Sequence, residues 1–175
     1  MLRTKRTRLN CEVLETRENP DGNVSLSVVG GSIFMQGDGV GNHIQLSQGP
    51  LGNNIVTGLN NTTINGQTTI NLGRFIPINV FIHGDGGADR IEVANMRIAG
   101  TLTIIPGDEN DRVDITNVSA SVVNINMGAG NDTLVVNGLI ARSALMLDGG
   151  SGSDLLHLSN VFAGSGYVRN FEQLI

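Results

Sequence analysis

The sequence repeats at intervals of 21 or 22 residues, and this period constrains the fold more than any other feature. Four segments align on an aspartate, and they read HGDGGADRIEV, PGDENDRVDI, MGAGNDTLVV and GGSGSDLLHL, with anchors at Asp89, Asp111, Asp132 and Asp154. A fifth segment, GDGVGNHIQL, aligns on Asn42, 47 residues before the first of these aspartates. A fixed period of this length is typical of stacked repeats, in which no single unit buries its own apolar face.

Apolar residues recur in the same columns of every repeat. The columns lie nine and seven residues before the anchor and two and four residues after it, and all five copies are apolar there. In chain order the members are Ile33, Met35, Ile44, Leu46, Val80, Ile82, Ile91, Val93, Leu102, Ile104, Val113, Ile115, Val123, Ile125, Leu134, Val136, Leu145, Leu147, Leu156 and Leu158. Apolar positions two residues apart, on either side of a Gly-rich turn, are typical of two strands that each bury one face.

These columns predict an all-β, single-domain parallel β-solenoid with about 22 residues per coil and roughly six coils. Stacking would line the interior with aliphatic ladders and leave other side chains outside, namely Arg90, Glu92, Arg112, Asp114 and His157. An antiparallel β-sandwich is the alternative, because it explains the alternation but not the constant spacing. The 47-residue interval fits two coils with a small insertion, although residues 48–77 lack an acidic anchor and their coils cannot be placed.

Composition agrees with this prediction and excludes other classes. The chain of 175 residues has 24 Gly, no Trp and 3% aromatic residues, so its core must be thin and aliphatic, and a compact helical enzyme is not expected. The apolar fraction of 39% is too high for a wholly disordered chain. Most of the acids lie beyond the first 17 residues and Lys5 is the last lysine, so no nucleic-acid partner is expected.

The first 22 residues form a separate basic segment. RTKRTRLNCEVLETRENP resembles the leader, a basic cluster followed by LExLExRxxP, that heads many secreted or surface repeat proteins in one group of bacteria; the matching residues are Leu14, Glu15, Arg17 and Pro20. The resemblance implies a secreted or cell-surface location. We therefore expect a disordered leader at 1–22 and the solenoid at 23–175, while a frayed basic tail is the alternative on chemistry alone.

Two further observations limit what the chain contains. Cys11 is the single cysteine, so it has no partner for an internal disulfide, and no Cys/His spacing suggests a zinc site. No apolar run approaches the ~18 residues of a membrane helix, so no transmembrane segment is expected.

The turn around Asp154 carries a second resemblance. GGSGSDLLH, residues 149–157, fits every fixed position of the GGxGxDxUx nonapeptide of the RTX family, and residues 128–135 keep all but its first Gly. In the other two copies Asp85 and Glu109 replace glycines. The resemblance implies a calcium-binding β-roll in a secreted bacterial protein. Carried over position by position, it predicts Ca²⁺ as the cofactor and, as metal-site residues, Asp89, Asp111, Asp132, Asp154, Gly130 and Gly152.

The chemistry of such turns supports two interpretations. Gly permits a turn with positive φ whose carbonyl groups lie beside a carboxylate, and these hard oxygens suit Ca²⁺. Alternatively, the anchors only stabilise the turns, because Asp and Asn accept hydrogen bonds from nearby backbone N–H groups. Two carboxylates ~5 Å apart in water repel by only about 0.8 kcal/mol, so a stacked row of aspartates does not require a metal.

We predict a non-catalytic function, that of a structural or adhesive module with cations bridging stacked turns. Its expected partners are a cell-surface or matrix polysaccharide or protein. A metal-free scaffold or self-associating spacer is the first alternative, and a β-helix polysaccharide lyase or hydrolase is the second. A glycosidase would need two carboxylates beside a sugar cleft, usually with aromatic platforms, whereas here the acids form one column and the aromatics are scattered.

The C-terminal segment YVRNFEQLI occupies the phase of a strand that precedes another anchor. It resembles the NFExL strand found between repeats in RTX-like arrays. Either Phe171 closes the core as a terminal cap, or this end pairs with a second copy in end-to-end self-association.

Overall fold

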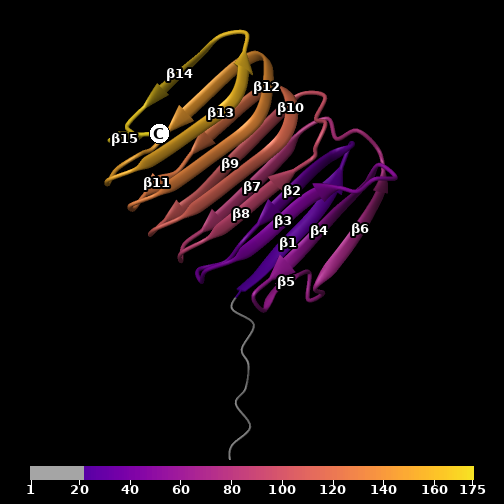
Figure 1. Cartoon of the computed structure of the whole chain (residues 1–175). Helices are drawn as coiled ribbons and strands as arrows, with labels where there is room; N and C mark the ends of the chain where they lie inside the picture. The colour runs from indigo at the N-terminus through magenta and orange to yellow at the C-terminus, as the bar shows by residue number, and fades with distance from the viewer. Residues whose placement is uncertain (1–21) are drawn as a thin grey trace, which may run out of the picture.

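The computed structural model describes residues 22–175, which form strands and turns without a helix (Figure 1). Fifteen strands belong to one continuous sheet. The first six are β1 (Gly22–Val29), β2 (Ser32–Gln36), β3 (His43–Gln48), β4 (Asn53–Leu59), β5 (Thr62–Ile64) and β6 (Thr69–Arg74). The others are β7 (Val80–Asp85), β8 (Arg90–Ala94), β9 (Thr101–Asp108), β10 (Arg112–Asn126), β11 (Gly128–Ala129), β12 (Thr133–Asp148), β13 (Leu155–Ala163), β14 (Gly166–Arg169) and β15 (Gln173–Leu174).

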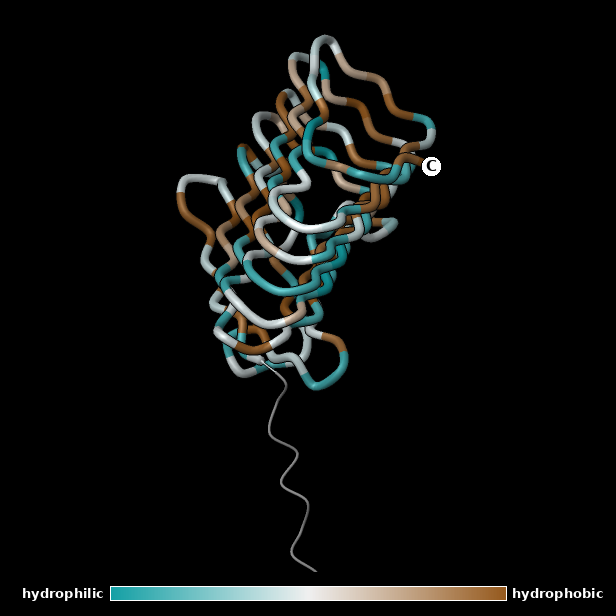
Figure 2. The backbone as a smooth tube through the Cα atoms, turned by 90° about the vertical axis from the view of Figure 1, so that its left-hand side faces the viewer, coloured by the Kyte–Doolittle hydropathy of each residue, from teal (hydrophilic) through white to brown (hydrophobic). Residues whose placement is uncertain are grey.

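The parallel strands form two ladders, one on each face of the stacked coils. One ladder runs β2, β7, β9, β10, β12 and β14, and the other runs β3, β8, β10, β12, β13 and β15. The long strands β10 and β12 belong to both ladders, because their first and second halves pair with different strands. Figure 2 shows the resulting stack of similar loops. The predicted parallel β-solenoid is confirmed, and the antiparallel sandwich is not the fold.

The core consists of the columns that the sequence predicts. Residues of one column face each other in adjacent strands, as Ile91, Val113 and Leu134 do. All but one of the twenty column residues are buried, and the exception, Leu158, is 36% exposed because only the two-residue strand β15 follows its coil. Full burial of an aliphatic side chain of this size contributes about 1.5–3 kcal/mol, so these ladders are the main source of stability.

A further column turns the chain at the corner six residues after each of the four aspartate anchors. Its members have positive φ and are Asn95, Asn117, Gly138 and Asn160. Glycine and asparagine are the residues that take up this left-handed conformation most readily, so the corner selects them.

Residues 48–79 depart from the repeat. The coil of Asn42 stacks directly on the coil of Asp89, because β2 pairs with β7 and β3 pairs with β8, both parallel. The expectation of two coils in the 47-residue interval is therefore wrong. In its place β4 folds back antiparallel to β3, and β6 lies antiparallel to β4. On the other ladder β1 lies antiparallel to β2, and β5 pairs with β1 in parallel. We call β1, β4, β5 and β6 the N-terminal cap, since they end the parallel stack on that side (Figure 1).

The two ends of the chain bear on other predictions. The leader predicted at 1–22 lies outside the described residues, except for Gly22, which begins β1. At the other end Phe171 is partly buried against the core, as the capping alternative predicts. Nothing in residues 22–175 is a helix long and apolar enough to cross a bilayer.

Candidate functional site

The predicted site residues Asp89, Asp111, Asp132 and Asp154 form a single row, which we call the aspartate row. Each stands just before a strand of the same ladder, at the end of its Gly-rich turn. Their exposed fractions are only 1–3%, so the carboxyl groups are enclosed between coils. Repetition of the turn thus brings together residues that are 21 or 22 positions apart in the sequence.

Each carboxylate of the row accepts a hydrogen bond from the backbone N–H of the preceding anchor. The N–H groups of Asp89, Asp111 and Asp132 donate to Oδ1 of the next aspartate at 2.7, 2.8 and 2.8 Å. Asn42 begins the row by donating to Asp89 at 2.6 Å, and Glu172 ends it by accepting from Asp154 at 2.7 Å. All these bonds run in one direction, so the row fixes the register of every coil against the next.

The second carboxylate oxygen, Oδ2, has no partner. It is buried in all four aspartates and accepts no hydrogen bond from the described residues. At Asp89 this oxygen lies against Gly84, on the side where the Pro106 carbonyl oxygen also lies. The Asn42 copy places its amide nitrogen Nδ2 correspondingly, against Gly37 and near the carbonyl oxygen of Gly84. An amide and a protonated carboxyl group have the same shape, so the site accommodates a neutral donor in this position.

Burial makes the carboxyl groups of the row weaker acids. It raises the pKa of Asp111 to about 7, and the charges of Asp89, Asp132 and Glu109 act in the same direction. Burial likewise raises the pKa of Asp89 and of Asp132 to about 6, against the opposing effect of their backbone hydrogen bonds. The pKa of Asp154 is raised for the same reason. Loss of solvation therefore outweighs the accepted hydrogen bonds at every position.

Gly130 and Gly152, the predicted glycines of the site, let the turns stack closely. Their φ angles are 154° and 145°. A Cβ atom at Gly130 would collide with the carbonyl oxygen of Glu109, and one at Gly152 would collide with that of Gly130. Where the motif has lost its glycines, Asp85 and Glu109 adopt positive φ of 81° and 79°. The motif glycines are thus explained by backbone conformation and by the distance between coils.

Other acids near this edge are engaged elsewhere. Asp148 pairs with Arg169 and accepts from the side chain of Asn170 at 2.8 Å, while Asp85 lies 3.2 Å from His83. Within residues 22–175 no group of three or more His, Cys, Asp or Glu side chains is arranged to hold a metal ion. Calcium binding by the row stays a prediction, for which the unpartnered Oδ2 atoms and nearby carbonyl oxygens are the available ligands.

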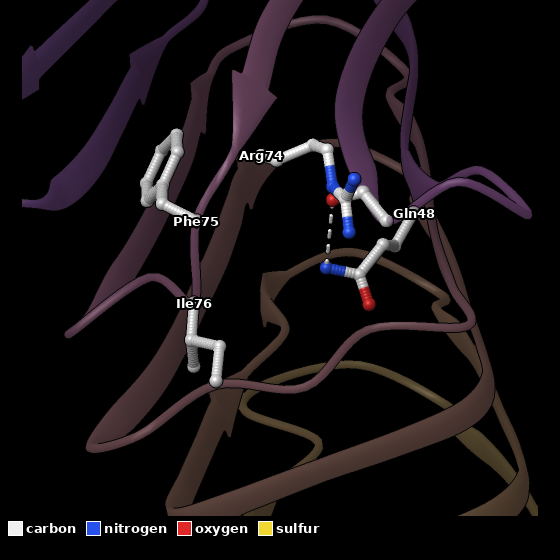
Figure 3. A pocket seen from close by; sticks show the side chains of 5 residues that line it. Gln48, Arg74, Phe75 and Ile76 are labelled. Atoms are coloured by element: carbon white, nitrogen blue, oxygen red, sulfur yellow. Dashed lines mark hydrogen bonds between the residues drawn. The ribbon is translucent and has the colours of Figure 1, made fainter.

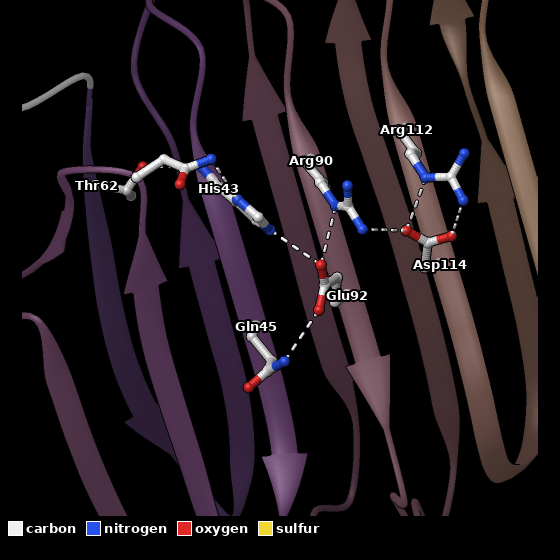
Figure 4. A network of polar contacts seen from close by, with 8 residues as sticks. His43, Gln45, Thr62, Arg90, Glu92, Arg112 and Asp114 are labelled. Atoms are coloured by element: carbon white, nitrogen blue, oxygen red, sulfur yellow. Dashed lines mark hydrogen bonds and ion pairs between the residues drawn. The ribbon is translucent and has the colours of Figure 1, made fainter.

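A polar cluster covers the flat face formed by β3, β8 and β10 (Figure 4). Glu92 accepts from His43 at 3.0 Å, from Gln45 at 2.9 Å and from Arg90 at 2.9 Å. Arg90 also reaches Asp114 on the next strand, at 3.2 Å. Burial alone would raise the pKa of Glu92, but these hydrogen bonds and the arginine charge lower it overall. Glu92 is therefore held as a carboxylate.

The aromatic and histidine residues are less scattered than the sequence suggests. The rings of Phe34 and Phe81 stack on adjacent strands with centroids 5.0 Å apart, beside a pocket of about 240 Å³. His83 lines the same pocket and contacts Gln36 at 3.0 Å. His43 belongs to the polar cluster, so these two histidines lie on different faces.

Two features of the aspartate row and of the coils were not predicted from the sequence. Glu172 ends the row although it follows Asp154 by 18 residues, which is off the period. The corner column of Asn95 and its equivalents was also overlooked, although its fixed spacing of six residues after the anchor is visible in the aligned repeats.

Comparison with models of known families, with curated proteins and with solved structures finds no match for this chain.

Proposed function

We propose that this chain is a non-catalytic β-solenoid of the cell exterior, serving as a stiff structural or adhesive module. The observation that carries the proposal is the row of hydrogen bonds running from Asn42 to Glu172. In every coil the aspartate accepts the same hydrogen bond, from the backbone N–H of the preceding anchor. A contact that is repeated in this way indicates a structural role. The extracellular part rests on the leader-like residues Leu14, Glu15, Arg17 and Pro20.

The arrangement of the other acids also favours a scaffold over a glycosidase. Glu92 and Asp114 are a carboxylate pair on the flat face, but both are bound by arginine side chains. A general acid needs a raised pKa, whereas that of Glu92 is lowered. Lyase or hydrolase activity is the weaker candidate for this reason, and an assay of polysaccharide cleavage tests it.

Calcium binding by the aspartate row is a second part of the proposal. It is favoured by the four buried Oδ2 atoms, because each leaves a hard oxygen ligand without a partner. Ca²⁺ at these positions would supply the positive charge that a row of ionised carboxylates lacks. The protein's own part would be to hold these oxygens at successive coils in one register.

Thermal unfolding separates the two forms of the proposal. The full chain is melted in EGTA and in calcium up to ~10 mM, above the range of weak extracellular sites. A calcium-bridged module gains several degrees in Tm, and Asp132→Ala with Asp154→Ala abolishes that gain. A Tm that is independent of calcium leaves the metal-free scaffold, and cleavage of a polysaccharide would overturn both.

A further inference from the structure

One pocket of the chain lies where the repeat is broken. It has a volume of about 340 Å³ and is lined by Gln48 at the end of β3, Gly52 in the following turn, and Arg74, Phe75 and Ile76 after β6 (Figure 3). None of these residues belongs to a repeating column. Sites of binding are concentrated on such non-repeating connections, because the regular elements are committed to stacking.

Arg74 provides an available positive charge in this pocket. Its guanidinium group makes no ion pair with any acid of residues 22–175, whereas Arg90, Arg112 and Arg169 are each paired. Most of the charges within residues 22–175 are negative, yet the positive charge of Arg74 has no carboxylate partner there. A guanidinium group in this state binds a carboxylate through two parallel N–H bonds.

Gln48 adds a hydrogen-bond acceptor. Its amide nitrogen donates to the carbonyl oxygen of Gly52 at 3.4 Å and to Asn54 Oδ1 at 3.3 Å, which fixes the orientation of the amide. Oε1 is left to accept from a ligand. Asn54, which is fully buried, also donates to the Phe75 carbonyl oxygen at 2.9 Å and holds that wall in place. Arg74 and Gln48 extend toward one another across the pocket in Figure 3.

We propose that this pocket binds one uronic-acid residue of an acidic polysaccharide. Arg74 takes the sugar carboxylate, Gln48 Oε1 accepts from a ring hydroxyl, and the half-exposed side chain of Ile76 contacts the apolar face of the sugar. The extracellular role proposed above supplies the setting, but the binding itself is independent of calcium and of the aspartate row.

An acidic peptide is the competing ligand and fits less well. An extended peptide would add along the free edge of β6, the last strand of the sheet path. The pocket opens instead at the ends of β3 and β6, over the turn that contains Gly52. A peptide carboxylate also brings no neighbouring hydroxyl group for Gln48.

Calorimetric titration of the full chain tests the proposal. The probes are hexamers of galacturonate, glucuronate and mannuronate, with a neutral malto-oligosaccharide and hexaglutamate as comparisons. At least one uronate should bind, more weakly as salt rises, and Arg74→Ala should weaken binding by about tenfold or more. Arg74→Lys should bind with intermediate affinity, since lysine keeps the positive charge but cannot donate two parallel N–H bonds to a carboxylate.

Arg142→Ala is the matched control, because Arg142 also lacks an acidic partner among residues 22–175 but donates to Ser119 outside this pocket. It should bind the uronate as the unmodified chain does. Circular dichroism melts should show that the variants fold. No uronate binding, an equal loss in both alanine variants, or equal binding of hexaglutamate overturns the proposal. The calcium melts above are unaffected by any of these results.

Discussion

The parallel coils and the N-terminal cap differ in how they satisfy the same backbone groups. From β7 to β14 each strand pairs in parallel with residues about 22 positions away, and the anchors repeat one set of contacts. In the cap, β4 pairs antiparallel with β3 of the first coil and with β6, so its partners are close in the sequence. The repeat period therefore determines which strands pair in the coils, whereas the turns between neighbouring strands determine the pairing in the cap. This difference also explains why the pocket of Arg74 is lined by residues outside the repeating columns.

The largest difference between the two regions should come from glycine substitution. Gly130→Ala in the coils should lower the free energy of unfolding by about 3 kcal/mol or more, because the added Cβ meets the Glu109 carbonyl in addition to the strained φ. Gly66→Ala in the cap, at φ 75° with open space around it, should cost about 1 kcal/mol. Urea unfolding measures both, and equal losses would show that coil spacing is not what requires the glycine.

Truncation of the core should have a smaller but still unequal effect. Leu134→Ala removes a fully buried side chain from the middle of a ladder and should cost about 3 kcal/mol. Ile70→Ala, on the partly buried strand β6, should cost about 1 kcal/mol. The test is the urea concentration at the midpoint of unfolding, compared between variants whose unfolding free energy has the same dependence on urea. A larger loss at Ile70 would mean that the cap, not the stack, carries the stability.

The effect of Asp111→Asn on stability should depend on pH. This substitution introduces the residue type that the first coil has at its anchor, Asn42. The pKa of Asp111 is about 7 in the folded chain against 3.8 ordinarily, so the folded chain binds more protons than the unfolded chain between these values. Its free energy of unfolding should therefore fall as pH rises from about 4 to about 7. Asp111→Asn keeps the Oδ1 acceptor without the charge and should be roughly 2 kcal/mol more stable at pH 8, with little change at pH 5.

Melts in EGTA at both pH values measure this effect, and Asp114→Asn on the exposed face serves as the control. A variant that is less stable at pH 8 would show that the row depends on ionised carboxylates and would contradict this prediction.

The smallest effects are expected on the flat face. Glu92→Ala should cost about 1 kcal/mol and lose little of this effect in high salt, because Gln45 is an uncharged partner. Asp114→Ala, whose partners are Arg90 and Arg112, should cost about 0.5 kcal/mol and lose most of it in 1 M NaCl. Unfolding by urea at low salt and in 1 M NaCl measures the loss of stability in each variant. An identical salt dependence of the two losses would contradict the prediction.

The stacked core was predictable from the sequence, but the cap was not. Columns such as Ile91, Val113 and Leu134 are defined by spacing alone, so five aligned copies were enough to find them. Antiparallel pairing instead depends on single turns, such as the one through Gly30 and Gly31, at φ 55° and 76°, that joins β1 to β2. A Gly-Gly pair is a hairpin signal, but it does not recur with the period.

The position of the anchors was predictable, but their burial was not. Aspartate after a Gly-rich turn is expected both for a calcium ligand and for a backbone acceptor, so the motif alone does not distinguish the two. The useful signal was Asn42, because a neutral side chain in the same column indicates that the position does not require a charge. In the structure its amide nitrogen donates to the carbonyl oxygen of Val40. The pocket depended on Arg74 and Gln48, 26 positions apart and outside any repeat, so no sequence pattern joined them.

The single direction of the aspartate row bears on how such chains change length in evolution. Every regular coil presents an anchor N–H on one side and a carboxylate oxygen on the other, so each coil fits after any other. An in-frame duplication of residues 112–132 would add one complete rung and one layer of aliphatic side chains without creating a new kind of contact. Insertions of other lengths would break the row, and the fold therefore permits growth or shortening in whole coils.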